Sequence, residues 1–161
     1  MLTTATRPGT GTPDERIPLT PIGRTRLAAR LERIENEILP EIREALQVSR
    51  EDPTIRAEFV RAVEEVERLG HALRHAVITD DLPDDPKTVE LGDLVTVRFG
   101  DGSVDSVLIV HPVEAPLDDI RIASTSAFAR ALLGSSIGDH IEFDRPDGTV
   151  QGARITRAVR V

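Results

Sequence analysis

A capping residue followed by proline and then by a long apolar stripe occurs twice in this chain, and this pattern constrains the fold more than any other feature. The first copy begins at Thr20 and Pro21, where a hydroxyl can cap a helix and the missing N–H of proline costs nothing. Apolar residues then recur at steps of three and four from Leu27 to Ala45, which is helical periodicity. Pro40 lies inside this stretch and removes one backbone hydrogen bond, so we expect a bend there.

The second copy begins at Asp52 and Pro53, which is again a cap followed by proline at the first helical position. Its apolar series runs from Phe59 to Val77 with steps close to a heptad. Two such helices joined by a short turn bury their stripes most simply against each other. The pattern therefore predicts an antiparallel two-helix coiled coil over residues 18–80, with the turn at its far end.

The period changes to two after residues 79–88, an acidic segment with two prolines that is typical of a linker. Asp-Gly pairs at 101–102 and 147–148 each stand between apolar runs, which is a strong signal for a β-hairpin. Between them, residues 126–133 predict a short helix capped by Ser126 and closed by glycine. Residues 81–161 are therefore expected to form a small antiparallel sheet domain with one short helix, and the chain is predicted to be α+β.

Composition narrows the function classes. The chain has 20 basic and 28 acidic residues, so no basic surface is left over for autonomous nucleic-acid binding. Aromatic residues make up 2% and cysteine is absent, which argues against base-stacking platforms, disulfides and zinc–thiolate sites. Residues 1–17 predict a disordered tail without a secretory signal, and no apolar run approaches the roughly 20 residues that span a bilayer. We expect a cytoplasmic monomer without membrane contact.

Three segments carry a resemblance to a known family. They are PLTPIGRTRL at 18–27, ILPEIREAL at 38–46 and SAFARALLGSSIGDHIEF at 126–143. Together they resemble the bacterial Gre transcript-cleavage factors, and the third segment is the most specific match. The resemblance covers nearly the whole chain and implies an N-terminal coiled coil followed by a domain similar to the FK506-binding proteins.

The resemblance also implies a partner and a mechanism. The sheet domain would dock on RNA polymerase, and the coiled coil would reach through the secondary channel to the active centre. In cleavage-competent members an acidic pair at the tip helps hold the second catalytic Mg²⁺, and the polymerase hydrolyses its own backtracked transcript. The chain would therefore have no cofactor of its own and would approach the Mg²⁺ of the polymerase.

The segment EDPTIRAEF, which begins at Glu51, aligns with the tip of that family. Asp52 matches the first acid and is the candidate metal contact, although it can equally serve only as the cap of the second helix. Ile55 stands where the second acid belongs, and Arg56 stands where the family usually has asparagine. Glu58 matches a further acidic position, and Glu51 could replace the missing acid. Mg²⁺ needs several oxygen ligands, so the isoleucine places cleavage activity in question.

The resemblance places polymerase docking at the short helix of the sheet domain. Ser126, Phe128 and Arg130 match the family there, whereas Thr125 and Ala127 depart from its commoner aspartate and proline.

Two other patterns carry less weight. His71 and His75 have the spacing of helical zinc ligands, but position 72 is alanine and no cysteine is present, so we interpret them as a solvated helix flank. A prolyl isomerase is not expected, because the sheet domain has only three phenylalanines, Phe99, Phe128 and Phe143, which its own core requires.

The leading prediction is a protein that is not an enzyme. It binds RNA polymerase, inserts its coiled coil into the secondary channel and inhibits transcription without stimulating transcript cleavage. The first alternative is an active cleavage factor, with Asp52 and either Glu51 or Glu58 serving the metal. The second alternative is a Gre-like interaction module for a different enzyme.

Overall fold

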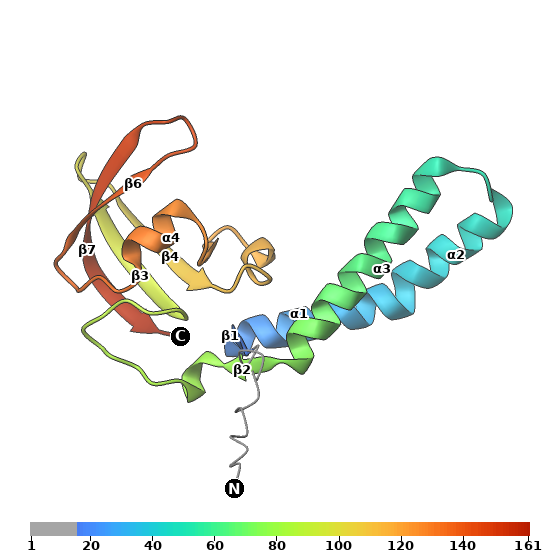
Figure 1. Cartoon of the computed structure of the whole chain (residues 1–161), viewed down its shortest axis with the longest axis horizontal. Coiled ribbons are helices and arrows are strands. Elements are labelled where there is room, and N and C mark those ends of the chain that lie inside the picture. Colours follow the sequence, from blue (N-terminus) through green and yellow to red (C-terminus); the bar gives the residue numbers. More distant parts are fainter. Residues whose placement is uncertain (1–15) are drawn as a thin grey trace, which may run out of the picture.

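A helical arm and a sheet domain make up the computed structural model, which describes residues 16–161 (Figure 1). This arrangement confirms the predicted α+β class. No helix in residues 16–161 is long and apolar enough to cross a membrane. The predicted tail lies outside the described residues as far as residue 15, but Ile17, its last member, belongs to a strand and is 8% exposed. The predicted tail therefore extends too far, because Ile17 has a place in the core.

The arm is a helical hairpin. Its elements are α1 (Pro21–Arg33), the wide helical turn η1 (Ile34–Ile38), α2 (Leu39–Val48) and α3 (Pro53–Arg74). The first three follow one another in a continuous helical course, and α3 returns beside them (Figure 1). The hairpin expected from the two apolar stripes is confirmed.

Both predicted helix caps are present. The Thr20 hydroxyl accepts a hydrogen bond from the Gly23 N–H at 2.9 Å, and the Asp52 carboxylate accepts one from the Thr54 N–H at 2.8 Å. Each cap satisfies a donor that the first helical turn leaves without a partner.

The bend expected at Pro40 takes the form of a widened turn. The Leu39 N–H donates to the Ile34 carbonyl, five residues back rather than four, immediately before the proline. A proline ring crowds the preceding turn, and a single wide turn accommodates that crowding without ending the helix.

The second helix ends earlier than its apolar series indicated. It stops at Arg74, and Val77 lies instead in β2 (Ala76–Ile78), which pairs in parallel with β1 (Ile17–Leu19). This two-stranded ribbon closes the base of the arm. Each strand has three residues, which is too short to show an alternating pattern, so the sequence did not predict it.

The arm has its own core. The buried residues of this cluster are Ile17, Leu19, Leu27, Ile34, Leu39, Ala62, Leu69 and Ala72. Two apolar residues from the sheet domain, Val113 and Leu117, pack against the same cluster. The arm and the sheet domain are therefore in apolar contact at the base of the arm.

The sheet domain holds five strands in the order β5-β4-β3-β7-β6. The strands are β3 (Asp93–Phe99), β4 (Val104–Val110), β5 (Arg121–Ala123), β6 (His140–Asp144) and β7 (Val150–Arg160), with α4 (Ala127–Leu132) after β5. Both predicted Asp-Gly hairpins are confirmed, as β3–β4 and β6–β7.

One pairing corrects the predicted antiparallel sheet. Strand β5 lies parallel to β4, so the sheet is mixed. The connection between them, residues 111–120, includes the short helix η3 (Ala115–Leu117) and is long enough to return the chain to the start of a parallel neighbour.

The predicted linker, residues 79–88, begins with the short helix η2 (Thr79–Asp81) and is fastened to the sheet domain by Arg160. The guanidinium of Arg160 lies 3.0 Å from Asp93 and 2.8 Å from Glu90, and it donates to the Thr79 carbonyl at 2.8 Å. Its Nη2 also lies 3.4 Å from Oδ1 of Asp84, so Arg160 at the end of β7 contacts the linker at both Thr79 and Asp84 and restrains its path.

Candidate functional site

Residues 49–52 form the turn that joins α2 to α3 at the tip of the arm. One oxygen of Asp52, Oδ1, accepts hydrogen bonds from the N–H groups of Thr54 and Ile55, at 2.8 and 3.4 Å. The other oxygen, Oδ2, receives no hydrogen bond from any residue between 16 and 161. Asp52 therefore caps α3 and retains one carboxylate oxygen that could face a partner.

The two residues that differ from the expected tip lie directly beside this cap. Ile55 is partly buried and offers hydrocarbon where an acid would offer oxygen. The Arg56 side chain folds back across the turn, and its Nε donates to the Arg50 carbonyl at 3.0 Å. Its Nη2 lies 3.9 Å from Oε1 of Glu51, whose side chain is almost fully exposed. The Arg56 cation thus stands next to Glu51, the residue suggested as a replacement for the second acid.

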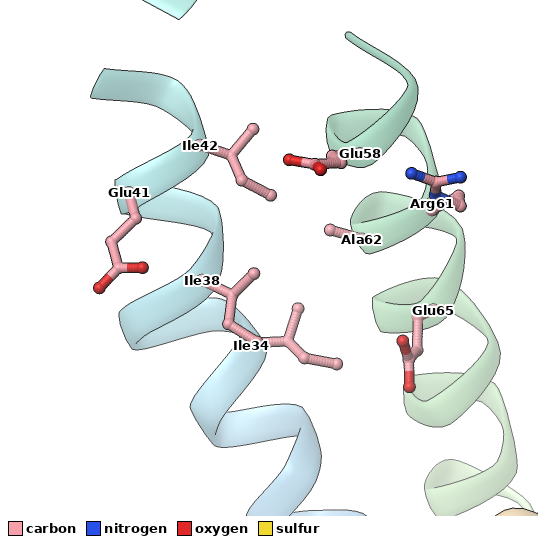
Figure 2. Close-up of a pocket in the computed structure, with 8 residues that line it drawn as sticks. All are labelled: Ile34, Ile38, Glu41, Ile42, Glu58, Arg61, Ala62 and Glu65. Atoms are coloured by element: carbon pink, nitrogen blue, oxygen red, sulfur yellow. The ribbon is translucent and has the colours of Figure 1, made fainter. Parts of the chain in front are cut away.

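Glu58 does not join Asp52. The two residues are six positions apart, which is about 9 Å along the helix axis. Figure 2 shows the Glu58 side chain directed across the arm, on the side of α3 that faces Ile42. It borders a cavity of about 390 Å³ between the helices, with Ile34, Ile38 and Ala62 among the lining residues. Glu58 therefore lies at this groove between the helices and not with Asp52 at the tip.

Metal ligands are sparse in the described chain. Among residues 16–161 no group of three His, Cys, Asp or Glu side chains is placed to hold an ion. The rings of His71 and His75 lie against each other, with centroids 4.5 Å apart. Asp52 could therefore contribute its free oxygen, Oδ2, to a metal that a partner already holds, which is less than Mg²⁺ needs from a site of its own.

The three docking candidates lie on α4 or at its cap, but they differ in how far their side chains are engaged by the protein itself. The Ser126 hydroxyl accepts from the Ala129 N–H at 3.2 Å and so caps the helix, as predicted. Phe128 stacks on Phe143 at 4.3 Å and packs against the sheet core. Arg130 is exposed and forms no ion pair with any residue that the structure describes. Arg130 is thus the best placed of the three to meet a partner.

Sequence reasoning missed one buried group where the two parts meet. Glu114 is fully buried and lies against Thr20 of the arm and Arg121 of β5. Burial raises the pKa of the Glu114 carboxyl, although the hydrogen bonds from Thr20 and the charge of Arg121 oppose that rise. The partners lie far apart in sequence, so no local pattern indicated the contact.

Comparison with known proteins bears on the identity of the chain. Residues 83–157 match the family model described as "Transcription elongation factor, GreA/GreB, C-term". A GreA transcription elongation factor from Thermomicrobium roseum is 31% identical over 153 residues, covering 88% of this chain and 96% of that protein. A GreA from Bacillus cytotoxicus is 29% identical over 144 residues, covering 83% and 91%.

Among solved structures, GreA factor homolog 1 (Gfh1) of Thermus thermophilus is 28% identical, with a TM-score of 0.41, 90% of this chain covered and 99% of that chain. The family assignment rests on the sequence matches, which extend through both the arm and the sheet domain. The chain belongs to the GreA/GreB family of transcription elongation factors.

Proposed function

We propose that this protein binds RNA polymerase through its sheet domain, places the tip of its arm in the secondary channel, and inhibits nucleotide addition without stimulating transcript cleavage. The observation that carries this proposal is the tip itself. Ile55 stands where the family resemblance implies an acid, Asp52 uses one oxygen as a helix cap, and Arg56 stands beside Glu51. Such a tip has little with which to hold a second Mg²⁺.

The overall form of the molecule supports the part of the proposal in which the arm occupies the secondary channel. The arm extends away from the sheet domain (Figure 1), so a domain held at a channel entrance could send the tip inward. A rod of two packed helices fills a channel without chemistry of its own. Inhibition would then follow from occupancy, and it would rise with protein concentration.

Cleavage-factor activity is the alternative, and the Oδ2 atom of Asp52 favours it. A single carboxylate oxygen could assist a metal that the polymerase already holds. The two functions differ in the fate of a backtracked transcript, so a cleavage assay separates them.

Binding and inhibition test the docking half of the proposal. Purified polymerase should retain the wild-type protein, and nucleotide addition should slow as the protein concentration rises. Arg130→Glu reverses an exposed charge at the docking helix and should weaken binding by about tenfold, which corresponds to about 1.4 kcal/mol. Arg157→Glu, which reverses another exposed arginine of the sheet domain, is the matched control.

Two results would contradict this. No retention of the wild-type protein by polymerase would favour a different partner. Unchanged binding by a folded Arg130→Glu variant would remove Arg130 from the docking face.

A further inference from the structure

The base of the arm holds an unusual helix cap. The connection between β4 and β5 reaches the start of α1 and inserts Glu114 there, fully buried. Its Oε1 accepts the backbone N–H of Thr20 at 2.6 Å, and its Oε2 accepts the Thr20 hydroxyl at 2.7 Å. The same hydroxyl accepts the Gly23 N–H, so one carboxylate and one threonine satisfy the backbone N–H groups of Thr20 and Gly23.

This pattern is a capping box completed by the other half of the molecule. In an ordinary capping box the third helical residue is a glutamate whose carboxylate reaches back to the N–H of the cap residue. Here the third helical residue is Gly23, and the carboxylate comes from Glu114 in the sheet domain. The glycine is required, since a Cβ at position 23 would lie 1.8 Å from Oε2 of Glu114.

Charge holds Glu114 on its other side. The Nε atom of Arg121 lies 3.7 Å from Oε2 of Glu114, and the Arg121 side chain is 4% exposed. Arg121 also pairs with Asp118, which pairs with Arg26 of α1 at 2.7 Å. A second polar tie therefore joins the sheet domain to the second turn of α1.

The position of Arg121 connects this joint to the docking helix. Arg121 opens β5, and the chain passes from β5 directly to the Ser126 cap of α4. The groups that orient α1 and the helix expected to dock thus lie on one short stretch of chain.

We propose that Glu114 is a positioning residue that fixes the direction of the arm relative to the sheet domain. By capping α1 from the sheet domain, it ties the first turn of the arm to the unit that docks. The effect of Glu114 on inhibition rests on the proposed function, because a tip enters a channel only if the docked domain directs it there. The effect of Glu114 on the direction of the arm can be measured on the protein by itself.

The absence of cysteine allows a direct measurement on the full chain. Spin labels on Val48→Cys near the tip and Val150→Cys on the sheet domain replace two exposed valines. Pulsed electron-spin distance measurements should give one narrow distribution for the otherwise wild-type protein. Glu114→Gln, which places an amide donor against the donors of Thr20, should at least double its width.

Two further variants separate direction from mere helix capping. Gly23→Ala expels the carboxylate while leaving every charged residue in place, and it should broaden the distribution in the same way. Gly23→Glu combined with Glu114→Ala moves the capping glutamate onto α1, which restores the cap without the tie. That double variant should regain helical stability but keep the broad distribution. Glu142→Gln, at an exposed glutamate of β6, should leave the distribution narrow.

The results decide the matter without polymerase. A narrow distribution in folded Gly23→Ala, or a return to a narrow distribution in the cis-capped double variant, would overturn the positioning role. If the distribution broadens as expected, variants that bind polymerase normally should need severalfold more protein for half-inhibition. Broadening together with unchanged inhibition would leave the positioning role standing and count against entry of the tip into the channel.

Discussion

At the scale of single residues, local chemistry was predictable and distant chemistry was not. Thr20, Asp52 and Ser126 were expected to cap helices, and each does so, because a cap and the N–H it serves lie within three residues of each other. Glu114 caps a residue 94 positions away, and nothing near it in sequence signals that role. Ile55 was singled out through the resemblance to the Gre family, which has an acid at the matching position. The periodicity of the chain by itself does not indicate that an acid is expected there.

His111 gives a residue-scale prediction about pH. Burial lowers its pKa from the ordinary value of 6.5, and its Nδ1 accepts a hydrogen bond from the Val113 N–H at 3.2 Å. Below pH 6.5, His111 therefore binds a proton in the unfolded chain while it stays neutral in the native protein. The free energy of unfolding should fall as the pH drops from 6.5 toward the native pKa, and this loss should level off below it.

Denaturant unfolding at pH 8 and at pH 5.5 measures this effect. His111→Gln keeps an acceptor for the Val113 N–H but does not titrate, so its stability should depend less on pH than that of the wild type. Glu114, whose pKa is raised, contributes in the opposite sense, yet it is present in both proteins and cancels in the difference. Parallel profiles for the two proteins would contradict the prediction.

At the scale of elements, long periodic segments and tight turns were predictable, and short pairings were not. The helices and the two Asp-Gly hairpins are as expected, because each carries its own pattern over many residues or in a demanding turn. The β1–β2 and β4–β5 pairings are parallel and extend over only three residues each, and such short pairings depend on tertiary contacts rather than local preference. The same limit explains why Ile17 and Val77 were assigned wrongly.

Leu69 tests the packing of the arm. It is 1% exposed in the arm cluster, so Leu69→Ala should cost about 2–5 kcal/mol through lost burial and the cavity left behind. Val60→Ala, at a residue of the same helix that is 52% exposed, should cost within about 0.5 kcal/mol and serves as the control. Denaturant unfolding followed by helical circular dichroism gives both numbers. Equal costs would mean that Leu69 does not belong to the buried core described for the arm.

At the scale of the whole molecule, two separate cores are joined in two places. The sheet cluster and the arm cluster share no buried residue. They meet through the β4–β5 connection and through the linker, which Arg160 fastens. The composition of residues 79–88 indicated a linker. It could not show that the last strand contacts this linker, since Thr79 and Arg160 are 81 positions apart in the sequence.

The sole lysine, Lys87, makes the linker directly measurable. A lysine-specific protease can cut the chain only there, and it needs a locally opened linker to do so. Arg160→Ala removes charge-assisted hydrogen bonds worth about 1.5–3 kcal/mol each, so cleavage should accelerate by about tenfold or more. Arg157→Ala, an exposed neighbour on the same strand, should leave the rate unchanged. Equal rates for wild type and Arg160→Ala would show that Arg160 does not restrain the linker.

Transcript cleavage in a backtracked polymerase complex tests the central claim most directly. The wild-type protein should bind the complex yet leave the cleavage rate at that of polymerase alone, because Ile55 cannot ligate Mg²⁺ and Arg56 offsets the nearby acid. Ile55→Glu combined with Arg56→Asn should gain cleavage, since it supplies the second carboxylate without a neighbouring cation. Robust cleavage by the wild-type chain, abolished by Asp52→Ala, would contradict the account and establish an active cleavage factor.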